Sequence, residues 1–331
     1  MTSVRQVFRG LRRPEGAGET YAVAPSPAHS KVLVGLDGSG RPALLVQCRQ
    51  PDQGRPAPVV MRAVEVRHDV SCIVTLPGAD PAARRMSLIR CVSDDPQLAD
   101  YFIDILESVV GLVPPEPSRM EVAAVVLRIC ELFAALDEPA RRDERALWAE
   151  LFVIAAANDP RAAAGWWRTD PTETFDFSAG RRRLEVKSYA RDPRGHHFSL
   201  GQLRPPEGVD ALVVSLCVRT AVGGTTVRDL VVRIRALLAS PELAFKVDQV
   251  VAKSLGNSTV EGMGTAFDEQ LALETWRCFR ALELPCVRTP VPPAVSDVRM
   301  RVAMDIGLGH PRREAGAVFT GFTLVLPAVG R

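Results

Sequence analysis

The residues best able to do chemistry lie within one stretch, from Thr174 to Tyr189, which contains Asp176, Glu185 and Lys187. Apolar and polar residues alternate on both sides of Gly180, and this pattern predicts a β-hairpin. Side chains two positions apart on a strand point the same way, so Glu185 and Lys187 share a face, and the hairpin can bring Asp176 beside them. Two carboxylates beside an ammonium group are costly to gather unless a divalent cation neutralises the acids. The stretch is therefore a candidate Mg²⁺ site with an attached lysine.

A plain structural interpretation fits the same three residues. Glu-x-Lys occurs by chance in many chains. An exposed amphipathic strand would carry Glu185 and Lys187 as a solvated ion pair that contributes less than ~1 kcal/mol. On these residues alone, the structural interpretation is favoured, and the choice depends on the rest of the chain.

Four short blocks carry a resemblance to a known group of enzymes. In chain order they are Leu147–Leu151, Phe175–Phe177, Leu184–Ser188 and His197–Leu203. In order and spacing they resemble a prokaryotic family of the PD-(D/E)XK nuclease superfamily, often encoded beside DNA methyltransferases and helicase-like ATPases. The resemblance extends over most of the chain. Ala146 and Ala149 depart from it, because glycine is expected at both positions.

The resemblance implies a metal site at the hairpin. Asp176, Glu185 and the backbone carbonyl of Val186 would bind Mg²⁺, with Mn²⁺ as a substitute, and Lys187 would orient the attacking water. Glu150, on a helix before the sheet, would complete the metal's outer shell or bind a second ion. The alternative for Glu150 is a position at the helix edge, facing water or paired with Arg145.

Other residues near the hairpin are expected to contact the substrate. Gln202 would orient a water or a backbone phosphate, or else remain a helix-surface amide. His197 would position its loop or contact a phosphate. The arginines expected at the DNA are Arg181, Arg182, Arg191 and Arg194. The His196-His197 pair does not predict a zinc site, because adjacent side chains diverge and no third ligand follows at a suitable spacing.

Basic residues are concentrated around this region. Residues 181–235 contain eleven Lys or Arg and five Asp or Glu, whereas the whole chain carries a net charge of only +2. A basic belt around the candidate site suits a polyanionic partner. The alternative is that arginine richness reflects a GC-rich genome.

Length and composition place the chain among soluble globular proteins. Its 331 residues are 47% hydrophobic and 24% charged, which is ordinary for that class. No apolar run approaches the ~20 residues of a membrane helix, and the N-terminal residues lack the apolar core of a signal peptide. Seven cysteines without CxxC spacing indicate reduced thiols. We therefore expect a cytoplasmic protein with no membrane segment and no disulfide framework.

The first region of the chain is expected to be mostly β. The predicted strands are Lys31–Leu36, Pro42–Cys48, Val64–His68, Cys72–Leu76 and Ser87–Val92. From Pro96 to Val110 apolar residues recur at helical spacing, and the proline-rich stretch Val113–Ser118 then marks a domain boundary. Residues 1–113 would form a recognition or docking module, and residues 118–331 a nuclease-like domain with a C-terminal extension.

The second region is expected to be a restriction-endonuclease-like αβββαβ core, so the fold class is α/β, or α+β overall. Its first strand would lie within residues 160–173. The other predicted elements are a helix capped by Ser118 and Glu121, a helix from Asp137 to Ala157, a buried strand Ala211–Val218, a helix Thr226–Leu238, a helix Glu242–Ala252, and strands Thr275–Leu284 and Asp297–Ile306. The Trp166-Trp167 pair is expected to be core rather than a base-stacking platform.

Taken with the resemblance, these features predict a Mg²⁺-dependent DNA endonuclease of restriction or phage-defence type. The alternative is a nuclease-like recognition or scaffold subunit of a multi-protein defence complex that does not cleave. We expect DNA as the substrate. A methyltransferase, a helicase-like ATPase and a second copy of the chain (a homodimer) are the candidate protein partners.

Overall fold

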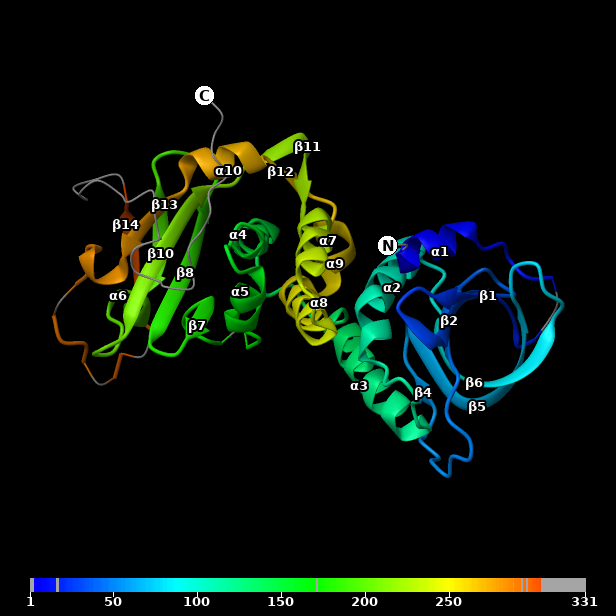
Figure 1. Ribbon diagram of the computed structural model, residues 1–331. Coiled ribbons are helices and arrows are strands. Elements are labelled where there is room, and N and C mark those ends of the chain that lie inside the picture. Colours follow the sequence, from blue (N-terminus) through cyan, green and yellow to red (C-terminus); the bar gives the residue numbers. More distant parts are fainter. Residues whose placement is uncertain are drawn as a thin grey trace. The chain divides into compact units, whose positions relative to one another are not determined.

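The computed structural model describes residues 3–15, 18–170, 172–287, 289–292, 294–295 and 297–304. Its contacts divide the chain into two compact units, each described here by itself (Figure 1). Unit 1 comprises Met1–Glu138 and Ser240–Lys253, and unit 2 comprises Pro139–Ala239 and Ser254–Arg331. The mixture of helices and strands in both units confirms the predicted fold class.

Unit 1 is built around a small β-barrel (Figure 1). Its strands are β1 (Thr20–Ser26), β2 (His29–Asp37), β3 (Pro42–Val46), β4 (Val59–Val60), β5 (Val64–Thr75) and β6 (Ala82–Cys91). The sheet order is β1-β2-β3-β6-β5-β4, and a parallel pairing between β1 and β5 closes the ring. Buried side chains such as Tyr21, Val23 and Leu45 form its core. Closure leaves few free strand edges, which protects the sheet from pairing with other chains.

Strand β5 joins the two strands that the sequence predicts at Val64–His68 and Cys72–Leu76. They are continuous because a β-bulge at His68 and Asp69 accommodates the polar interruption, with Ser87 of β6 opposite both residues. Asp69 has a φ of 56°, a left-handed conformation that aspartate adopts more readily than most residues. The bulge turns both side chains away from the regular alternation of the strand.

Four α-helices belong to the described part of unit 1. They are α1 (Val4–Gly10), α2 (Pro96–Val109), α3 (Arg119–Ala135) and α8 (Pro241–Leu255). The structure confirms the predicted capping box of α3, because Ser118 and Glu121 each bond the other's backbone N–H. Helix α8 joins this unit partly through Ser108, whose Oγ donates to Asp248 Oδ2 over 2.6 Å. The compact units therefore divide after Glu138 rather than near residues 113–118, since α3 packs on β5 and β6.

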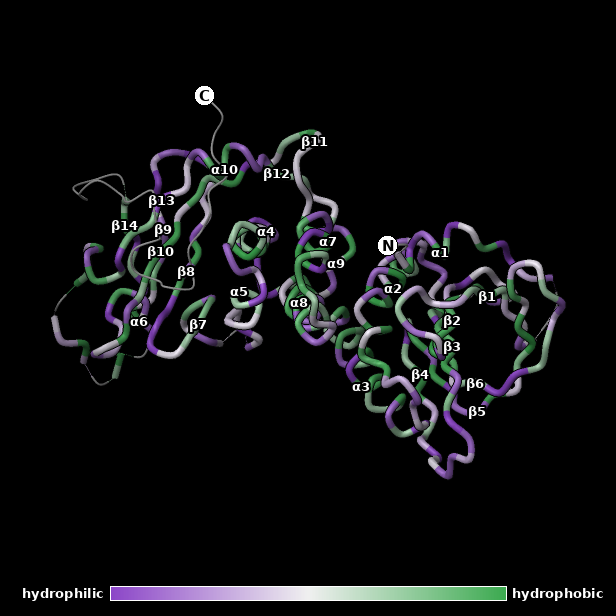
Figure 2. The backbone as a smooth tube through the Cα atoms, in the orientation of Figure 1, coloured by the Kyte–Doolittle hydropathy of each residue, from purple (hydrophilic) through white to green (hydrophobic). Residues whose placement is uncertain are grey.

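Unit 2 contains a four-stranded sheet in the order β13-β10-β8-β7. The strands are β7 (Phe177–Ala179), β8 (Arg182–Tyr189), β10 (Asp210–Cys217) and β13 (Arg277–Arg280). β10 runs parallel to β8 and antiparallel to β13, and β7 forms an antiparallel hairpin with β8. β10 is the buried central strand that the sequence predicts, and its hydrophobic residues stand out in Figure 2.

Unit 2 also contains other helices and short strands. They are α4 (Glu144–Ala155), α5 (Pro160–Trp166), α6 (Leu200–Leu203), α7 (Val227–Leu237), α9 (Thr259–Gly262), α10 (Glu269–Thr275), β9 (Gly195–Ser199), β11 (Thr220–Thr226), β12 (Ala266–Phe267) and β14 (Arg299–Ala303). β9 pairs with β14, and β11 with β12. Helix α4 packs on β8 and α7, which places it beside the hairpin.

The structure corrects three predictions about this unit. The first strand expected within residues 160–173 is instead the helix α5, because Asp159 caps its N-terminus and Pro160 occupies its first turn. The helix expected from Asp137 begins at Glu144, where Asp143 is the N-cap. The C-terminal strands are shorter than predicted: β13 covers Arg277–Arg280, and β14 ends at Ala303, with Asp305 and Ile306 outside the described residues.

All seven cysteines are free thiols, as the scattered spacing predicts. Over the described parts of the chain, the structure contains no helix with the length and apolarity needed to cross a bilayer.

Candidate active site

The predicted hairpin forms and brings Asp176 to strand β8. Asp176 lies in the bend just before β7, and Gly180, with a φ of 58°, makes the turn into β8. The backbone N–H of Val186 donates to Asp176 Oδ2 over 2.7 Å. Asp176 is therefore fixed beside the strand that carries Glu185 and Lys187, and its side chain is almost fully buried.

Glu185 and Lys187 form a buried ion pair rather than a solvated one. Lys187 Nζ lies 2.7 Å from Glu185 Oε1 and 5.2 Å from the centre of the Phe198 ring. Glu185 is only 4% exposed. Burial, followed by the negative charge of Asp176, raises the pKa of Glu185 above its ordinary value. The interpretation as an exposed amphipathic strand is therefore wrong.

One oxygen of Glu185 has no hydrogen bond to the rest of the described chain. Oε2 is buried and unpartnered, whereas Oε1 accepts from Lys187. A buried carboxylate oxygen without a donor is costly. A buried carboxylate oxygen without a hydrogen-bond partner is a suitable ligand for a cation.

Arg168 provides the positive charge nearest to Asp176. Its Nη2 lies 2.6 Å from Asp176 Oδ1, and its backbone N–H donates to the carbonyl of Asp176 over 2.9 Å. Nη1 donates to the carbonyl of Glu173 over 2.6 Å, while Nε is buried without a hydrogen-bond partner. Both oxygens of Asp176 are therefore engaged, one by Arg168 and the other by Val186.

Glu150 is buried on α4 and held by other side chains. Arg142 Nη1 lies 2.6 Å from each of its carboxylate oxygens, and Trp167 Nε1 donates to Oε2 over 2.7 Å. Arg168 Nη2 is farther away, at 3.9 Å from Oε1. Burial and then Asp176 raise the pKa of Glu150, while Arg142 and Arg168 oppose that rise. The contacts anchor Glu150 and give no support to its predicted role as a metal ligand.

The site therefore balances three acids against three cations. The acids are Glu150, Asp176 and Glu185, and the cations are Arg142, Arg168 and Lys187. All three carboxylates are nearly inaccessible to water, so each needs a matching charge nearby. Sequence reasoning missed Arg142 and Arg168, because neither belongs to a motif. The signal that could have found them is the requirement that buried acids have partners.

The residues present fit a small divalent cation. Asp176 and Glu185 supply carboxylate oxygens, the kind of ligand that Mg²⁺ prefers. Oε2 of Glu185 makes no hydrogen bond that would compete with a bound cation. The described residues contain no group of three or more His, Cys, Asp or Glu that could hold a metal. A site here would therefore use two carboxylates together with backbone or solvent oxygens.

Gln202 and His197 lie on either side of the start of α6. The Gln202 side chain accepts from the backbone N–H of Ser199 and donates to the carbonyl of Thr174. It thereby fixes the segment that leads to Asp176, while its expected contact with a water or a backbone phosphate stays a prediction. His197 is exposed on β9, where it remains available to a phosphate.

The four arginines expected at the DNA differ in their surroundings. Arg191 is exposed, and Arg181 is exposed at the hairpin turn with Nε donating to the carbonyl of Gly208. Arg182 is half-buried at the start of β8. Arg194 is only 6% exposed. Of these four, Arg194 is the one whose predicted contact with DNA the structure contradicts.

Arg194 instead ties several elements together. Its guanidinium donates to the hydroxyl of Tyr189, to the hydroxyl and carbonyl of Ser215 and to the carbonyl of Thr275. His196 shares this cluster, with Nε2 2.7 Å from Ser215 Oγ. Burial lowers the pKa of His196 to about 3, so it is neutral near pH 7. The cluster is structural.

Of the tryptophan pair, Trp167 is part of the core, as expected. Trp167 is 1% exposed, and its indole N–H is used by Glu150. Trp166 is half-buried in α5.

Comparison with known proteins gives one match. A family model whose description reads "Putative PD-(D/E)XK family member" (DUF4420) matches residues 4–305. No curated protein and no solved structure matches the chain.

Proposed function

The chain belongs to this PD-(D/E)XK family, and we propose that it is a metal-dependent nuclease that hydrolyses phosphodiester bonds in DNA. One observation carries the proposal. Asp176 is hydrogen-bonded to the amide that follows Glu185, and Lys187 is paired with Glu185 on the same strand. The family's motif residues are thus gathered in one buried cluster.

The chain's own residues divide the work. Asp176, Glu185 and the Val186 carbonyl would hold Mg²⁺, with Mn²⁺ as a substitute. When bound, the cation supplies Lewis acidity toward the scissile phosphate. Lys187, held by Glu185 Oε1 and packed over the Phe198 ring, would orient the attacking water and face the negative charge that develops on the phosphate.

A second candidate function is favoured by one specific contact. Arg168 lies 2.6 Å from Asp176 Oδ1 and neutralises the carboxylate that a metal would need. A nuclease-like subunit that binds DNA or a partner without cleaving would keep such a site permanently closed by an arginine. Fold and motif alone do not decide between the two functions.

The test is DNA cleavage by the purified chain with Mg²⁺, with Mn²⁺ and with EDTA. Glu185→Gln should abolish cleavage and leave the fold intact, because it removes the ligand charge and conserves shape. Glu173→Gln is the matched control, since Glu173 is an exposed acid of the neighbouring loop. Cleavage that survives in EDTA would overturn the metal dependence, and cleavage that survives in Glu185→Gln would overturn the assigned site. Metal binding without any cleavage would favour the scaffold.

The biological setting is proposed on the family resemblance. Genes of the family it resembles often lie beside genes for DNA methyltransferases and helicase-like ATPases. We therefore propose a restriction or phage-defence role, with a methyltransferase and a helicase-like ATPase as partners. A homodimer and a cytoplasmic location are proposed with it. Co-purification of the tagged chain with the neighbouring gene products would test the partners.

A further inference from the structure

A two-stranded ribbon lies beside the candidate active site, and the proposed mechanism does not use its exposed face. It consists of β9 and β14, which pair antiparallel along their whole length. The ribbon lies on the side of the four-stranded sheet opposite to α4 (Figure 1). Side chains alternate along each strand, so one face of the ribbon is buried and the other is turned outward. The inner face consists of His196, Phe198, Met300 and Val302.

The outer face of the ribbon carries positive charge and no acid. It is made of three cross-strand pairs: Gly195 with Ala303, His197 with Arg301, and Ser199 with Arg299. His197, Arg299 and Arg301 are exposed. The face therefore offers two guanidinium groups and an imidazole to a partner, and an anion is the partner that suits them.

These three side chains are available for contacts with another molecule. Within the described parts of the chain, His197 and Arg301 make no hydrogen bond and no ion pair. Arg299 pairs with Asp297, with Nε 3.2 Å from Oδ2, and the two side chains are 74% and 64% exposed. An ion pair so exposed to water is weak, so a phosphate can replace Asp297.

The segments that form and flank the ribbon are also basic. Apart from the buried Arg194, residues 190–204 and 297–304 contain four arginines and two aspartates. One of the aspartates, Asp192, is already paired with Arg219 from outside these segments, at 3.6 Å. The excess of positive charge is thus spread over several exposed side chains.

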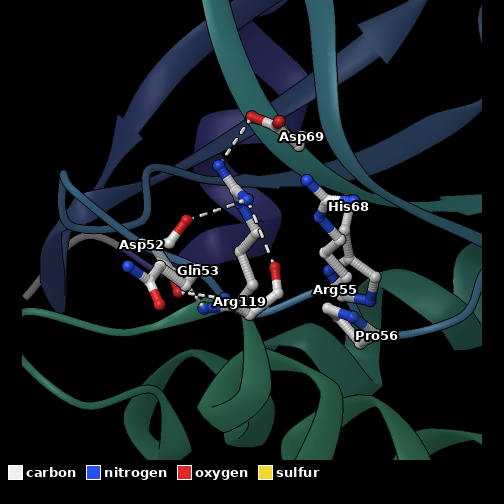
Figure 3. Close-up of a pocket in the computed structure, with 8 residues that line it drawn as sticks. Asp52, Gln53, Arg55, Pro56, His68, Asp69 and Arg119 are labelled. Carbon is white, nitrogen blue, oxygen red and sulfur yellow. Dashed lines mark hydrogen bonds and ion pairs between the residues drawn. The ribbon is translucent and has the colours of Figure 1, made fainter.

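The polar cavity of unit 1 has no comparable excess of charge. It is lined by two aspartates, two arginines and a histidine, and Arg119 Nη2 lies 2.9 Å from Asp69 Oδ1 (Figure 3). The acids and arginines of its lining balance each other. The ribbon is therefore the better candidate for binding a polyanion.

The ribbon is fixed to the active site at two points. Phe198, on the inner face, has its ring centre 5.2 Å from Nζ of Lys187. At the end of β9, the Gln202 side chain accepts from the backbone N–H of Ser199 and donates to the carbonyl of Thr174. A duplex held on the outer face would therefore keep a constant position relative to the residues proposed to cleave it.

The dimensions of the ribbon suit the major groove of B-form DNA. Its two strands lie about 5 Å apart, and five residues extend over about 15 Å. The major groove, about 12 Å wide, admits a two-stranded β-ribbon. Arginine is the side chain that most often reads a base there, through two hydrogen bonds to guanine. Arg301 and His197 face each other across the middle of the ribbon, where base edges would be nearest.

We propose that the outer face of the β9–β14 ribbon enters the major groove of duplex DNA and sets a sequence preference. Arg301 and His197 contact base edges, and Arg299, at the end of the ribbon, contacts a backbone phosphate. The inference rests on the proposed function in one respect, that DNA is the substrate. It adds a recognition element, with two arginines that no motif of the sequence singles out.

The test is selection of duplexes from a randomised DNA library by the full chain, followed by titration of the selected duplex by fluorescence anisotropy. Both are done in EDTA, so that binding is measured without metal-dependent cleavage. We expect wild type to enrich a motif that contains guanine. Arg301→Gln and His197→Ala should each bind the selected duplex about tenfold more weakly and lose the preference at one position. Arg299→Gln should weaken binding of all sequences alike and lower the salt slope by about 1.

Arg280→Gln is the matched control. Arg280 is an exposed arginine of the same unit with one acidic neighbour, Glu283. Strand alternation places it on the opposite face from Phe279, which belongs to the same core cluster as Phe198. This variant should bind the selected duplex as wild type does. All four variants should melt at the wild-type temperature, because each changes an exposed side chain.

The outcomes separate the ribbon from the nuclease. Equal binding of random and selected duplexes by wild type, or full affinity and preference in Arg301→Gln, would overturn the ribbon proposal. Duplex RNA bound as tightly as DNA would also overturn it, because side chains cannot read the narrow major groove of A-form RNA. A chain that cleaves DNA while the ribbon variants bind normally retains the nuclease and loses the ribbon. A chain with the expected preferences that never cleaves retains the ribbon and loses the nuclease.

Discussion

At the scale of residues, the candidate active site depends on charge matching in a buried place. Asp176 and Glu185 lie close enough for the charge of one to raise the pKa of the other. Lys187 and Arg168 each neutralise one of them. Because the acids are buried, removing either partner leaves an uncompensated charge, and this changes both stability and metal affinity.

The first prediction concerns Lys187. Lys187→Ala should reduce the single-turnover rate of DNA cleavage by about 10²-fold, the scale expected when a preorganised charge at a transition state is lost. DNA binding should remain nearly unchanged, because one phosphate contact among many contributes modestly. Cleavage and binding must be measured at the same salt concentration. A loss of cleavage fully explained by weaker binding would make Lys187 part of a basic surface instead.

The second prediction concerns Arg168 and rests on the proposed metal site. Arg168→Gln removes the guanidinium that would compete with a metal ion for Asp176. The affinity for Mn²⁺, measured by electron paramagnetic resonance, should therefore rise at least about tenfold. Without metal the variant should be less stable by about 3 kcal/mol, because a buried ion pair is broken.

Arg142→Gln is the matched control for this experiment. Arg142 pairs with Glu150 rather than with Asp176, so its loss should cost similar stability without raising metal affinity. Equal metal affinities in wild type, Arg168→Gln and Arg142→Gln would show that Arg168 does not compete with the cation.

At the scale of elements, the β7–β8 hairpin and the parallel pairing of β8 with β10 position the site. The hairpin register places Phe177 opposite Leu184, so Asp176 falls next to Glu185 and Val186. Strand β10 holds β8 along its whole length, from Arg182 to Tyr189. The turn between β7 and β8 is therefore the local feature on which the approach of the two acids depends.

The third prediction tests that turn. Gly180 has a φ of 58°, and a Cβ added there would meet no atom within 4 Å. Gly180→Ala should therefore cost about 1 kcal/mol through backbone conformation alone, measured by urea unfolding. Gly180→Asn should cost less, because asparagine adopts the left-handed region more readily. Equal losses for the two variants would point to a cause other than backbone conformation.

At the scale of the whole molecule, the chain passes between its two compact units more than once. Unit 1 takes residues 1–138 and then Ser240–Lys253, which follow helix α7 of unit 2 in the chain. The returning helix α8 is joined to the rest of unit 1 by Ser108 with Asp248 and by Arg128 with Glu242. The division by contacts therefore does not follow the linear order of the sequence.

The fourth prediction follows from this arrangement. A fragment of residues 1–138 lacks α8, so it should expose apolar surface of α2 and α3 and melt well below the same fragment joined to residues 240–255 by a flexible linker. Thermal unfolding by circular dichroism, with dye binding to exposed apolar surface, compares the two. If both fragments melt at the same temperature, α8 does not stabilise unit 1.

Local patterns predicted a large part of this protein. Alternation around Gly180 predicted the hairpin that gathers Asp176, Glu185 and Lys187, and Ser118 with Glu121 predicted the start of α3. The signal for α5 was also local, since Asp159 fits the N-cap and Pro160 the first turn of a helix, although a strand was expected in this region. Such signals act over a few residues and survive without tertiary context.

Only the tertiary structure decided the surroundings of the site and the division into units. Arg142 and Arg168 acquire their roles by being buried with Glu150 and Asp176, and nothing in their spacing indicates that burial. The same holds for Arg194. A DNA contact was expected for it, whereas the structure buries its side chain in the interior of unit 2. Barrel closure by β1 with β5 and the return of α8 to unit 1 join segments far apart in the chain. Sequence periodicity fixes which face of an element is apolar, whereas long-range packing chooses what that face and its charges meet.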